Sequence, residues 1–134
     1  MSDKCRKAQR PTSPHLQAYR LPLTAILSIT HRMTGAGLSL GMILIAAFLL
    51  AAATGEEYYN ATMNIITSPF GIIIMFLWSL ALYFHTFNGI RHMIWDTGRL
   101  LEADKAMRSN YYVIAATLIT TFGTWAFACP AFPW

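Results

Sequence analysis

Charged residues are scarce in this chain. Asp, Glu, Lys and Arg make up 12% of its 134 residues, and hydrophobic residues make up 55%. A soluble domain usually has about 25% charged residues. Because so few charges cannot cover a surface that faces water, the composition excludes an ordinary soluble domain and favours a protein surrounded by lipid.

Cysteine is almost absent as well. Only Cys5 and Cys129 occur, and an iron–sulfur cluster needs a larger set of thiolate ligands. The glycine-rich fingerprint of dinucleotide-binding proteins is also missing. The chain therefore lacks the sequence features of an enzyme that carries its own iron–sulfur or nicotinamide centre.

The missing charges leave three long apolar blocks. No Asp, Glu, Lys or Arg occurs in Met33 to Thr54, in Tyr58 to Ile90, or in Ser109 to Trp134. A membrane-spanning helix needs about 20 mostly apolar residues, so each block is long enough to cross a bilayer. The pattern predicts an all-α membrane protein with three transmembrane helices, at about residues 22–53, 69–96 and 110–129.

Local signals indicate where these helices begin and end. Pro22 suits a first helical turn, and Ser68-Pro69 is typical of an N-cap followed by proline at the first helical position. Residues 54–57 are expected to form the turn after the first span. Residues 98–109 are expected to form a short charged loop before the third.

The basic residues predict the orientation in the membrane. All ten Lys and Arg residues precede the first uncharged block or lie between the second and third. Three crossings place them on one side, and Glu56 and Glu57 on the other. The positive-inside rule then puts the N-terminus inside and the C-terminus outside. Residues 1–21 are expected to be a basic inner arm, and residues 22–134 the three-helix anchor.

The net charge of +4 does not indicate a nucleic-acid partner. The basic residues flank membrane spans, so their placement is explained by topology. We expect the chain to contact membrane lipid and to have no nucleic-acid partner.

The first cluster of polar residues lies at the start of the first span. Ser28, His31 and Arg32 are spaced i, i+3, i+4, so they share one helix face. Gly35 continues this face and lets another group approach the backbone. Arginine and histidine are costly at membrane depth unless they are paired or face a cavity. Two interpretations stay open: a binding site, or an arginine that reaches lipid phosphates beside a histidine that packs.

The second cluster lies near the end of the second span. His85, Asn88, Gly89 and His92 form one stripe of a helix, and His85 lies roughly 9 Å deeper than Arg91. A histidine in hydrocarbon beside a glycine is a candidate haem ligand, because haem iron accepts imidazole. The alternative is a hydrogen-bonded packing residue. Since His92 projects from the same face, a second axial ligand must come from elsewhere.

Four short motifs follow one another along the chain: Arg10-Pro11, Ser13-Pro14-His15-Leu16, Ser28-x-x-His31-Arg32-x-Thr34-Gly35, and His85-x-x-x-Gly89-x-Arg91-His92-x-x-x-Asp96. In this order, and with three spans, they closely resemble the cytochrome b556 family of membrane anchors of succinate dehydrogenase, respiratory complex II. The resemblance covers residues 10–128 or so. The Asn-Gly-Ile-Arg-His form is similar to the alphaproteobacterial and mitochondrial branch.

The resemblance implies a multi-pass, haem b-binding anchor of succinate:ubiquinone oxidoreductase in a bacterial or mitochondrial inner membrane. His85 stands where the family has its haem axial ligand, the metal-binding position, with the other ligand from a second anchor subunit. His31 and Arg32 stand where the family places groups near the haem propionates. Ser28 and Arg32 match ubiquinone-site residues, and Asp96 matches an acidic residue near that pocket.

The resemblance also implies partners. The chain cannot oxidise succinate alone, so electrons must arrive from an iron–sulfur subunit attached to a flavoprotein subunit. Ubiquinone is then the substrate, and haem b is shared with the second membrane-anchor subunit.

Three other functions remain open at this point. The chain could be a haem-free anchor that is structural or binds only quinone, or the anchor of a fumarate reductase that runs the reverse reaction. A small transporter that uses the intramembrane His and Arg residues is less favoured. It would need a continuous polar stripe, which the first span lacks beyond Ser39.

Overall fold

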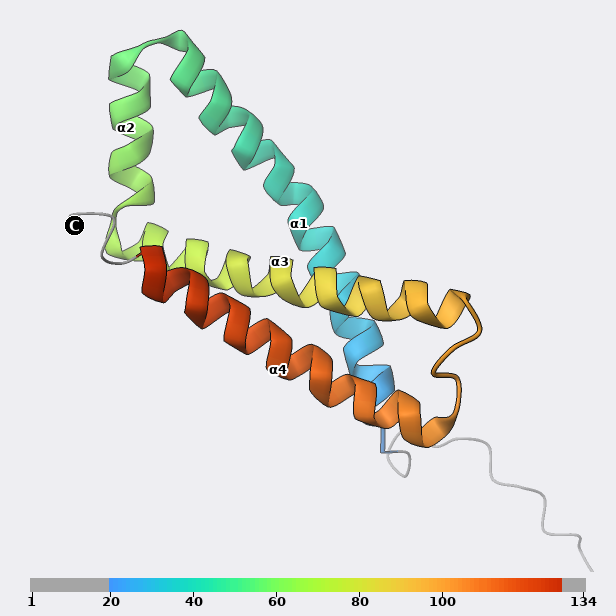
Figure 1. Cartoon of the computed structure of the whole chain (residues 1–134). Coiled ribbons are helices and arrows are strands. Elements are labelled where there is room, and N and C mark those ends of the chain that lie inside the picture. The colour runs from blue at the N-terminus through green and yellow to red at the C-terminus, as the bar shows by residue number, and fades with distance from the viewer. Residues whose placement is uncertain (1–19, 129–134) are drawn as a thin grey trace, which may run out of the picture.

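The computed structural model of the chain describes residues 20–128 (Figure 1). These residues form four helices, α1 (Leu23–Thr54), α2 (Glu56–Ile66), α3 (Pro69–Asp96) and α4 (Ala103–Ala128), and within them there is no strand. Three of the helices, α1, α3 and α4, are long and apolar enough to cross a membrane. The prediction of an all-α protein with three spans is confirmed. The expected inner arm, residues 1–21, lies outside the described residues except for its last two.

Helices α3 and α4 run antiparallel and side by side, and α1 crosses α3 at an angle (Figure 1). The second half of α1 diverges from α3, and α2 connects the far end of α1 back to the start of α3. The start of α1, the end of α3 and the start of α4 meet at one end of the molecule. A hydrogen bond from Asn110 of α4 to Thr24 of α1 joins two of them there.

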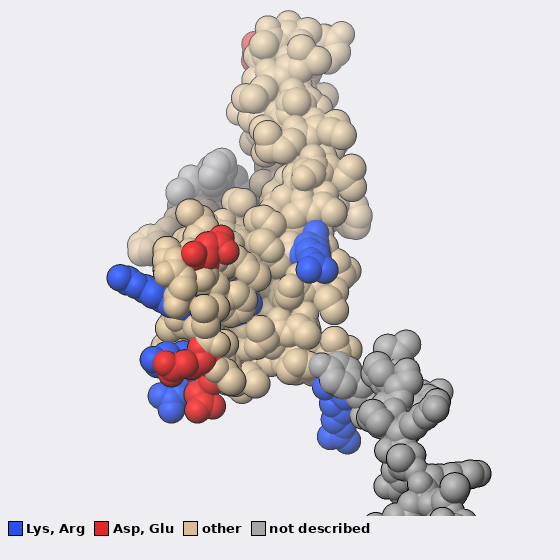
Figure 2. All heavy atoms as spheres, turned by 90° about the vertical axis from the view of Figure 1, so that its right-hand side faces the viewer, with Lys and Arg blue, Asp and Glu red and all other residues tan. Residues whose placement is uncertain are grey.

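Charged side chains gather at this same end. Figure 2 shows blue and red side chains around the α3–α4 connection, whereas the long helical surface above it is uncharged up to an acidic group near its tip. We call this region the charged end and define it by Arg20, Asp96, Arg99, Glu102, Asp104, Lys105 and Arg108. The apolar parts of all three long helices extend away from it.

The limits of α1 follow from two residues that do not continue a helix. Pro22 is extended, and its carbonyl oxygen accepts the first hydrogen bond, from the Ala25 amide at 2.9 Å. Gly55 has φ of +146°, a conformation that side chains with a β-carbon rarely adopt. The chain therefore leaves α1 and enters α2 through this one residue.

The prediction of a turn over residues 54–57 is wrong in its extent, because helix α2 begins within it. The turn is confined to Gly55, and Glu56 already begins an 11-residue helix. Glu56 and Glu57 occupy its first turn, where carboxylates interact favourably with the positive end of the helix dipole. An acidic pair directly after a glycine is a helix-start signal, so the sequence itself indicates the start of α2.

Helix α3 begins as the sequence predicts. The Ser68 hydroxyl accepts a hydrogen bond from the Gly71 amide at 3.1 Å, and Pro69 occupies the first helical position. A β-carbon at residue 71 would overlap the carbonyl oxygens of Ile65 and Ile66. The last turn of α2 therefore packs directly against the first turn of α3.

Helix α4 begins seven residues earlier than expected. The predicted start was about residue 110, after a loop over 98–109, but the helix starts at Ala103. Charged residues mark only the part of a helix that lies outside hydrocarbon, and they do not by themselves predict a loop. Residues 103–108 are mostly good helix formers, and the Asp104 carboxylate in the first turn interacts favourably with the positive end of the helix dipole.

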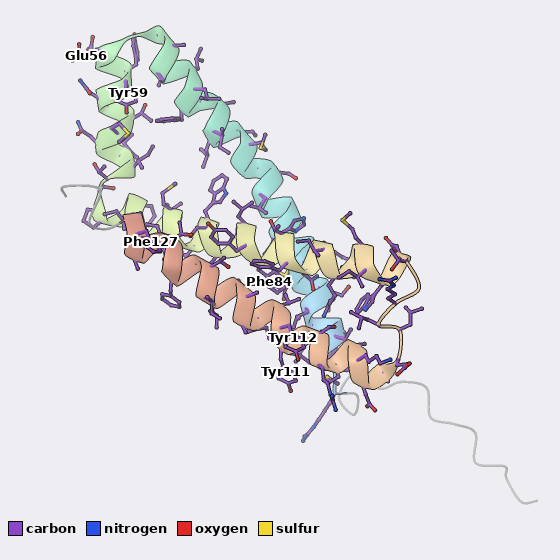
Figure 3. The ribbon with its side chains drawn as sticks, viewed as in Figure 1. Glu56, Tyr59, Phe84, Tyr111, Tyr112 and Phe127 are labelled. Carbon is purple, nitrogen blue, oxygen red and sulfur yellow. The ribbon has the colours of Figure 1, made fainter. Side chains whose placement is uncertain are left out.

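The early start places Tyr111 and Tyr112 inside α4 rather than at its beginning. Both are exposed and project from α4 close to where it meets α1 (Figure 3). Tyrosines at such a depth suit the boundary between hydrocarbon and lipid headgroups, because their rings are apolar and their hydroxyls polar.

The interior of the bundle is polar and its surface is apolar. Within the described residues only Leu27 and Val113 are buried hydrophobic side chains, whereas large apolar side chains along every helix are exposed. This is the reverse of a soluble core and suits a lipid solvent, in which small and polar residues mediate helix contacts. The buried polar residues are Asn88, Arg91, Ser109, Asn110, Thr117 and Thr121.

Two glycines allow α1 to cross close to α3. Gly35 faces the imidazole of His85, and Gly41 is buried beneath the indole of Trp78, which a β-carbon at residue 41 would overlap. Along α3 and α4 the contact is made by side-chain hydrogen bonds instead. One example is Trp125, whose indole nitrogen donates to the Ser79 hydroxyl at 2.9 Å.

Candidate functional site

Three of the four histidines come together between α1 and α3, on the side toward the charged end. The His31 and His85 rings are stacked, with centroids 4.0 Å apart and planes 5° from parallel. The His92 ring lies 5.3 Å from His31 on the other side of the cluster. His31 therefore stands between the two histidines of α3, a juxtaposition that spacing along either helix does not predict.

The His85 imidazole contacts α1 through its Nδ1 atom. This nitrogen lies 3.1 Å from the backbone carbonyl oxygen of His31 and 3.3 Å from the hydroxyl of Thr34. Within residues 20–128, the other ring nitrogen, Nε2, makes no hydrogen bond. Thr34 donates its own proton to the carbonyls of Thr30 and His31, both at 2.9 Å.

The glycines of the two motifs lie against histidine rings. A β-carbon at Gly35 would lie 2.9 Å from Cε1 of His85, which is too close for an undisturbed contact. A β-carbon at Gly89 would lie 3.6 Å from Nε2 of His31, which is an ordinary contact. The group that Gly35 lets approach the α1 backbone is therefore His85.

A buried arginine links all three spanning helices. Arg91 of α3 is 3% exposed, and its Nη1 donates to the side-chain oxygen of Asn110 on α4. The Asn110 amide then donates to the Thr24 hydroxyl of α1 at 2.9 Å. The Arg91 guanidinium also lies 4.5 Å from the centroid of the Trp95 ring. This network holds the charged end together.

Several buried polar atoms near this network have no hydrogen-bond partner among the described residues. They belong to His31 (Nε2), Asn88 (both amide atoms), Arg91 (Nε and Nη2) and Trp95 (Nε1). Most of them are hydrogen-bond donors. The interior at this end of the bundle thus retains several hydrogen-bond donors without a partner among the described residues.

The residues expected to bind quinone lie at the edge of this cluster. Ser28 is half-buried on α1, one turn before the exposed Arg32, and Asp96 is exposed at the last position of α3. Arg32 and Asp96 both lie near enough to His92 to act on it electrostatically. Within residues 20–128 none of the three makes a side-chain hydrogen bond.

A complete metal site does not form from the described residues alone. No group of three or more His, Cys, Asp or Glu side chains there could hold a metal ion. His92 packs edge-on against Trp95, with ring centroids 5.0 Å apart. The stacked His31 and His85 rings, with centroids 4.0 Å apart, leave no room for a haem plane between them.

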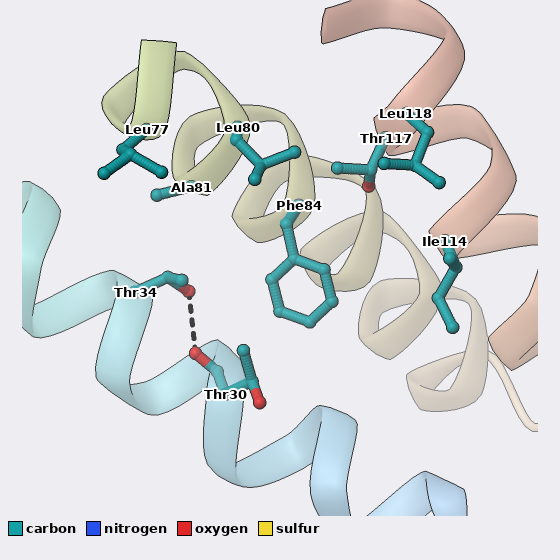
Figure 4. A pocket seen from close by; sticks show the side chains of 9 residues that line it. All are labelled: Thr30, Thr34, Leu77, Leu80, Ala81, Phe84, Ile114, Thr117 and Leu118. Carbon is teal, nitrogen blue, oxygen red and sulfur yellow. Dashed lines mark hydrogen bonds between the residues drawn. The ribbon is translucent and has the colours of Figure 1, made fainter. Parts of the chain in front are cut away.

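Two open apolar pockets lie beside Thr34, the residue whose hydroxyl contacts His85. One of about 310 Å³ lies between α1, α3 and α4 (Figure 4), and one of about 430 Å³ lies along the α1–α3 groove. Both are bordered by Thr30 and Thr34 of α1 and by Leu77 and Ala81 of α3. Thr34 therefore separates apolar space from the His85 imidazole.

Some residues at this site were not singled out from the sequence. Thr34 lies in the motif of the first span without an expected role of its own, and Asn110 lies outside all four motifs. The positions of Thr34 and Arg91 inside the motifs could have drawn attention to them. No sequence signal points to Asn110, because its role depends on which face α4 turns toward Arg91.

The sequence of the chain is similar to those of known membrane subunits. Residues 6–124 match the family described as succinate dehydrogenase/fumarate reductase transmembrane subunit. The chain is 40% identical over 113 residues to the succinate dehydrogenase cytochrome b556 subunit of Paracoccus denitrificans, covering 84% of this chain and 87% of that protein. It is 34% identical over 118 residues to the human mitochondrial cytochrome b560 subunit, covering 87% of this chain and 70% of that protein.

Proposed function

The chain belongs to the succinate dehydrogenase/fumarate reductase transmembrane subunit family, and we propose that it is the haem b-binding membrane anchor of a succinate:ubiquinone oxidoreductase. In this function it holds the flavoprotein and iron–sulfur subunits at the charged end and shares haem b with a second membrane-anchor subunit. It also forms part of the site where ubiquinone is reduced.

The observation that carries the haem proposal is the placement of His85. Its Nδ1 is engaged by α1 and its Nε2 is free of hydrogen bonds within residues 20–128. Histidine ligands of metals generally donate one ring N–H to a carbonyl or carboxylate and coordinate through the other nitrogen. The names of the relatives, cytochrome b556 and b560, agree with a haem in this family.

His31 and Arg32 are proposed to donate hydrogen bonds to the haem propionates. Nε2 of His31 is buried without a partner among the described residues, and Arg32 is exposed one residue later. Both side chains can donate hydrogen bonds to carboxylates. Bound haem b would supply a one-electron carrier between the dehydrogenase and the membrane.

The site that binds and protonates the quinone is proposed to contain Ser28, Arg32 and Asp96. Reduction of a quinone to a quinol requires two electrons and two protons. The Ser28 hydroxyl can donate a hydrogen bond to a quinone carbonyl, and the Arg32 guanidinium can stabilise negative charge that develops on it. Asp96, exposed at the charged end, can pass protons from water.

The charged end is proposed to face the cytoplasm or matrix. It contains most of the described basic residues, whereas the Gly55 turn at the opposite end is followed by Glu56 and Glu57. The N-terminus then lies inside and the C-terminus outside, in agreement with the positive-inside rule.

The test is a comparison of two histidine variants in the purified complex. His85→Ala should abolish the reduced-minus-oxidised b-type absorbance, while the protein still inserts in the membrane. His92→Ala, on the same helix and beside the same His31 ring, should retain it. A normal haem spectrum in His85→Ala would refute the ligand assignment.

A further inference from the structure

Residues of α1 determine how the His85 ring is held. The ring edge that carries Nδ1 and Cε1 faces the α1 backbone between His31 and Gly35, and one ring face is covered by the parallel His31 imidazole. We propose that Thr34 and Gly35 are positioning residues for His85 and that they make Nε2 its metal-coordinating atom. This inference rests on the proposed function of His85 as a haem ligand.

The carbonyl contact determines which ring nitrogen carries the proton. A carbonyl oxygen can only accept a hydrogen bond, so at 3.1 Å from the His31 oxygen Nδ1 must be the protonated nitrogen. Two unprotonated atoms at that distance would repel each other. The neutral imidazole then has its free lone pair on Nε2, which is the form that a metal requires.

The Thr34 hydroxyl reinforces this arrangement. Its proton is directed to the carbonyl of Thr30, as the dashed line in Figure 4 marks, and also to the carbonyl of His31. Its oxygen therefore presents a lone pair to the Nδ1–H of His85, 3.3 Å away. The His85 proton is thus shared between two acceptors of α1, the His31 carbonyl oxygen and the Thr34 hydroxyl oxygen, which belong to residues three positions apart. Such hydrogen bonds fix the orientation of a ligating imidazole and raise its basicity.

Gly35 supplies the space for this contact. A β-carbon at residue 35 would lie 2.9 Å from Cε1 and 3.5 Å from Nδ1 of His85. Since the ring face is covered by His31, an added methyl group would turn the imidazole or separate α1 from α3. Either change moves Nε2. Gly37, two residues further along α1, has no atom within 4 Å of its added β-carbon, so it provides a matched control.

The experiment measures the haem itself in the purified complex, by electron paramagnetic resonance and by redox titration. Gly35→Ala should shift the haem g-values and midpoint potential or lower the haem content, while Gly37→Ala should match the wild type. Thr34→Val, which preserves shape but removes the hydroxyl, should shift the same signals. Thr34→Ser, which restores the hydroxyl, should return them toward the wild type.

The outcomes separate the inference from the proposed function. Loss of haem in His85→Ala, with wild-type spectra and potentials in Thr34→Val and Gly35→Ala, would overturn the positioning inference alone. Retention of a normal haem in His85→Ala would overturn the proposed function as well. If Gly35→Ala does not assemble, Thr34→Val against Thr34→Ser decides: no difference between them overturns the inference.

Discussion

Arg91 is the side chain whose burial is most costly at this site. Arginine stays charged in proteins, and within residues 20–128 no carboxylate pairs with it. Its charge is offset in part by the Asn110 side-chain oxygen and by the face of the Trp95 ring. The permanent positive charge acts on His31 and His92. It therefore makes this part of the bundle attractive to anionic groups.

Removal of the Ser28 hydroxyl should impair the reaction with quinone specifically. Ser28→Ala loses one proposed hydrogen bond to the quinone, and such a bond contributes about 1.4 kcal/mol at most. Because 1.4 kcal/mol corresponds to a factor of ten, the kcat/KM for ubiquinone should fall by about tenfold. Arg32→Leu should have a larger effect, since its charge is lost too. The measurement is the rate of succinate-dependent ubiquinone reduction over a range of quinone concentrations.

Two controls belong with that measurement. Succinate oxidation by an artificial dye should stay at the wild-type rate, because the dye takes electrons before they reach the membrane. Ser39→Ala removes another α1 hydroxyl, one that only donates to the Gly35 carbonyl, and should leave quinone reduction unchanged. Equal loss of the dye and quinone activities in Ser28→Ala would indicate misassembly and count against the quinone-site assignment.

At the scale of helices, the crossing of α1 over α3 decides the site. Gly35 and Gly41 lie six residues apart on α1 and contact His85 and Trp78 of α3. These contacts keep the backbones close enough for the His31 carbonyl to reach the His85 ring. Without close approach the histidines of the two helices would not stack.

Gly41→Ala should destabilise this crossing. The added β-carbon would overlap the Trp78 indole, and overpacking of a well-packed contact usually costs about 1–3 kcal/mol. Gly37→Ala meets open space, and alanine is the better helix former by about 1 kcal/mol, so its stability should not fall. Thermal unfolding of the detergent-solubilised complex measures both variants. A melting temperature for Gly41→Ala equal to that of Gly37→Ala would contradict this account of the crossing.

At the scale of the whole molecule, polar and apolar groups are segregated in two ways. Polar side chains lie between the helices and apolar ones face outward, and most of the charged side chains lie at one end, with Glu56 and Glu57 at the other (Figure 2). The first segregation suits a lipid solvent. The second distinguishes the two faces of the membrane.

This charge asymmetry predicts the orientation of the chain. A reporter enzyme that is active only outside the cytoplasm should be active when fused after Trp134 or inserted after Glu57, and inactive when fused before Met1. The physical reason is the retention of Lys- and Arg-rich segments on the inner side. Activity of the N-terminal fusion together with inactivity of the other two would reverse the proposed topology.

The sequence predicts the number of spans and the start of α3. It also predicts that the candidate site residues of each span share a helix face. Hydrophobic length, a Ser-Pro cap and the 3.6-residue helical period are local properties, and each is readable within one segment. The start of α4 and the presence of α2 differ from the prediction, because charged residues form helix readily outside hydrocarbon and do not by themselves mark a loop.

Only the tertiary structure decides which residues meet across helices. It buries Arg91 and leaves Arg32 exposed, stacks His31 on His85, and brings Thr34 to the imidazole. These pairings depend on the register and angle at which α1 crosses α3. Both are set by contacts such as those of the His85 and Trp78 side chains with Gly35 and Gly41. These contacts join residues that are about fifty positions or fewer apart in the sequence. The periodicity of neither helix predicts them.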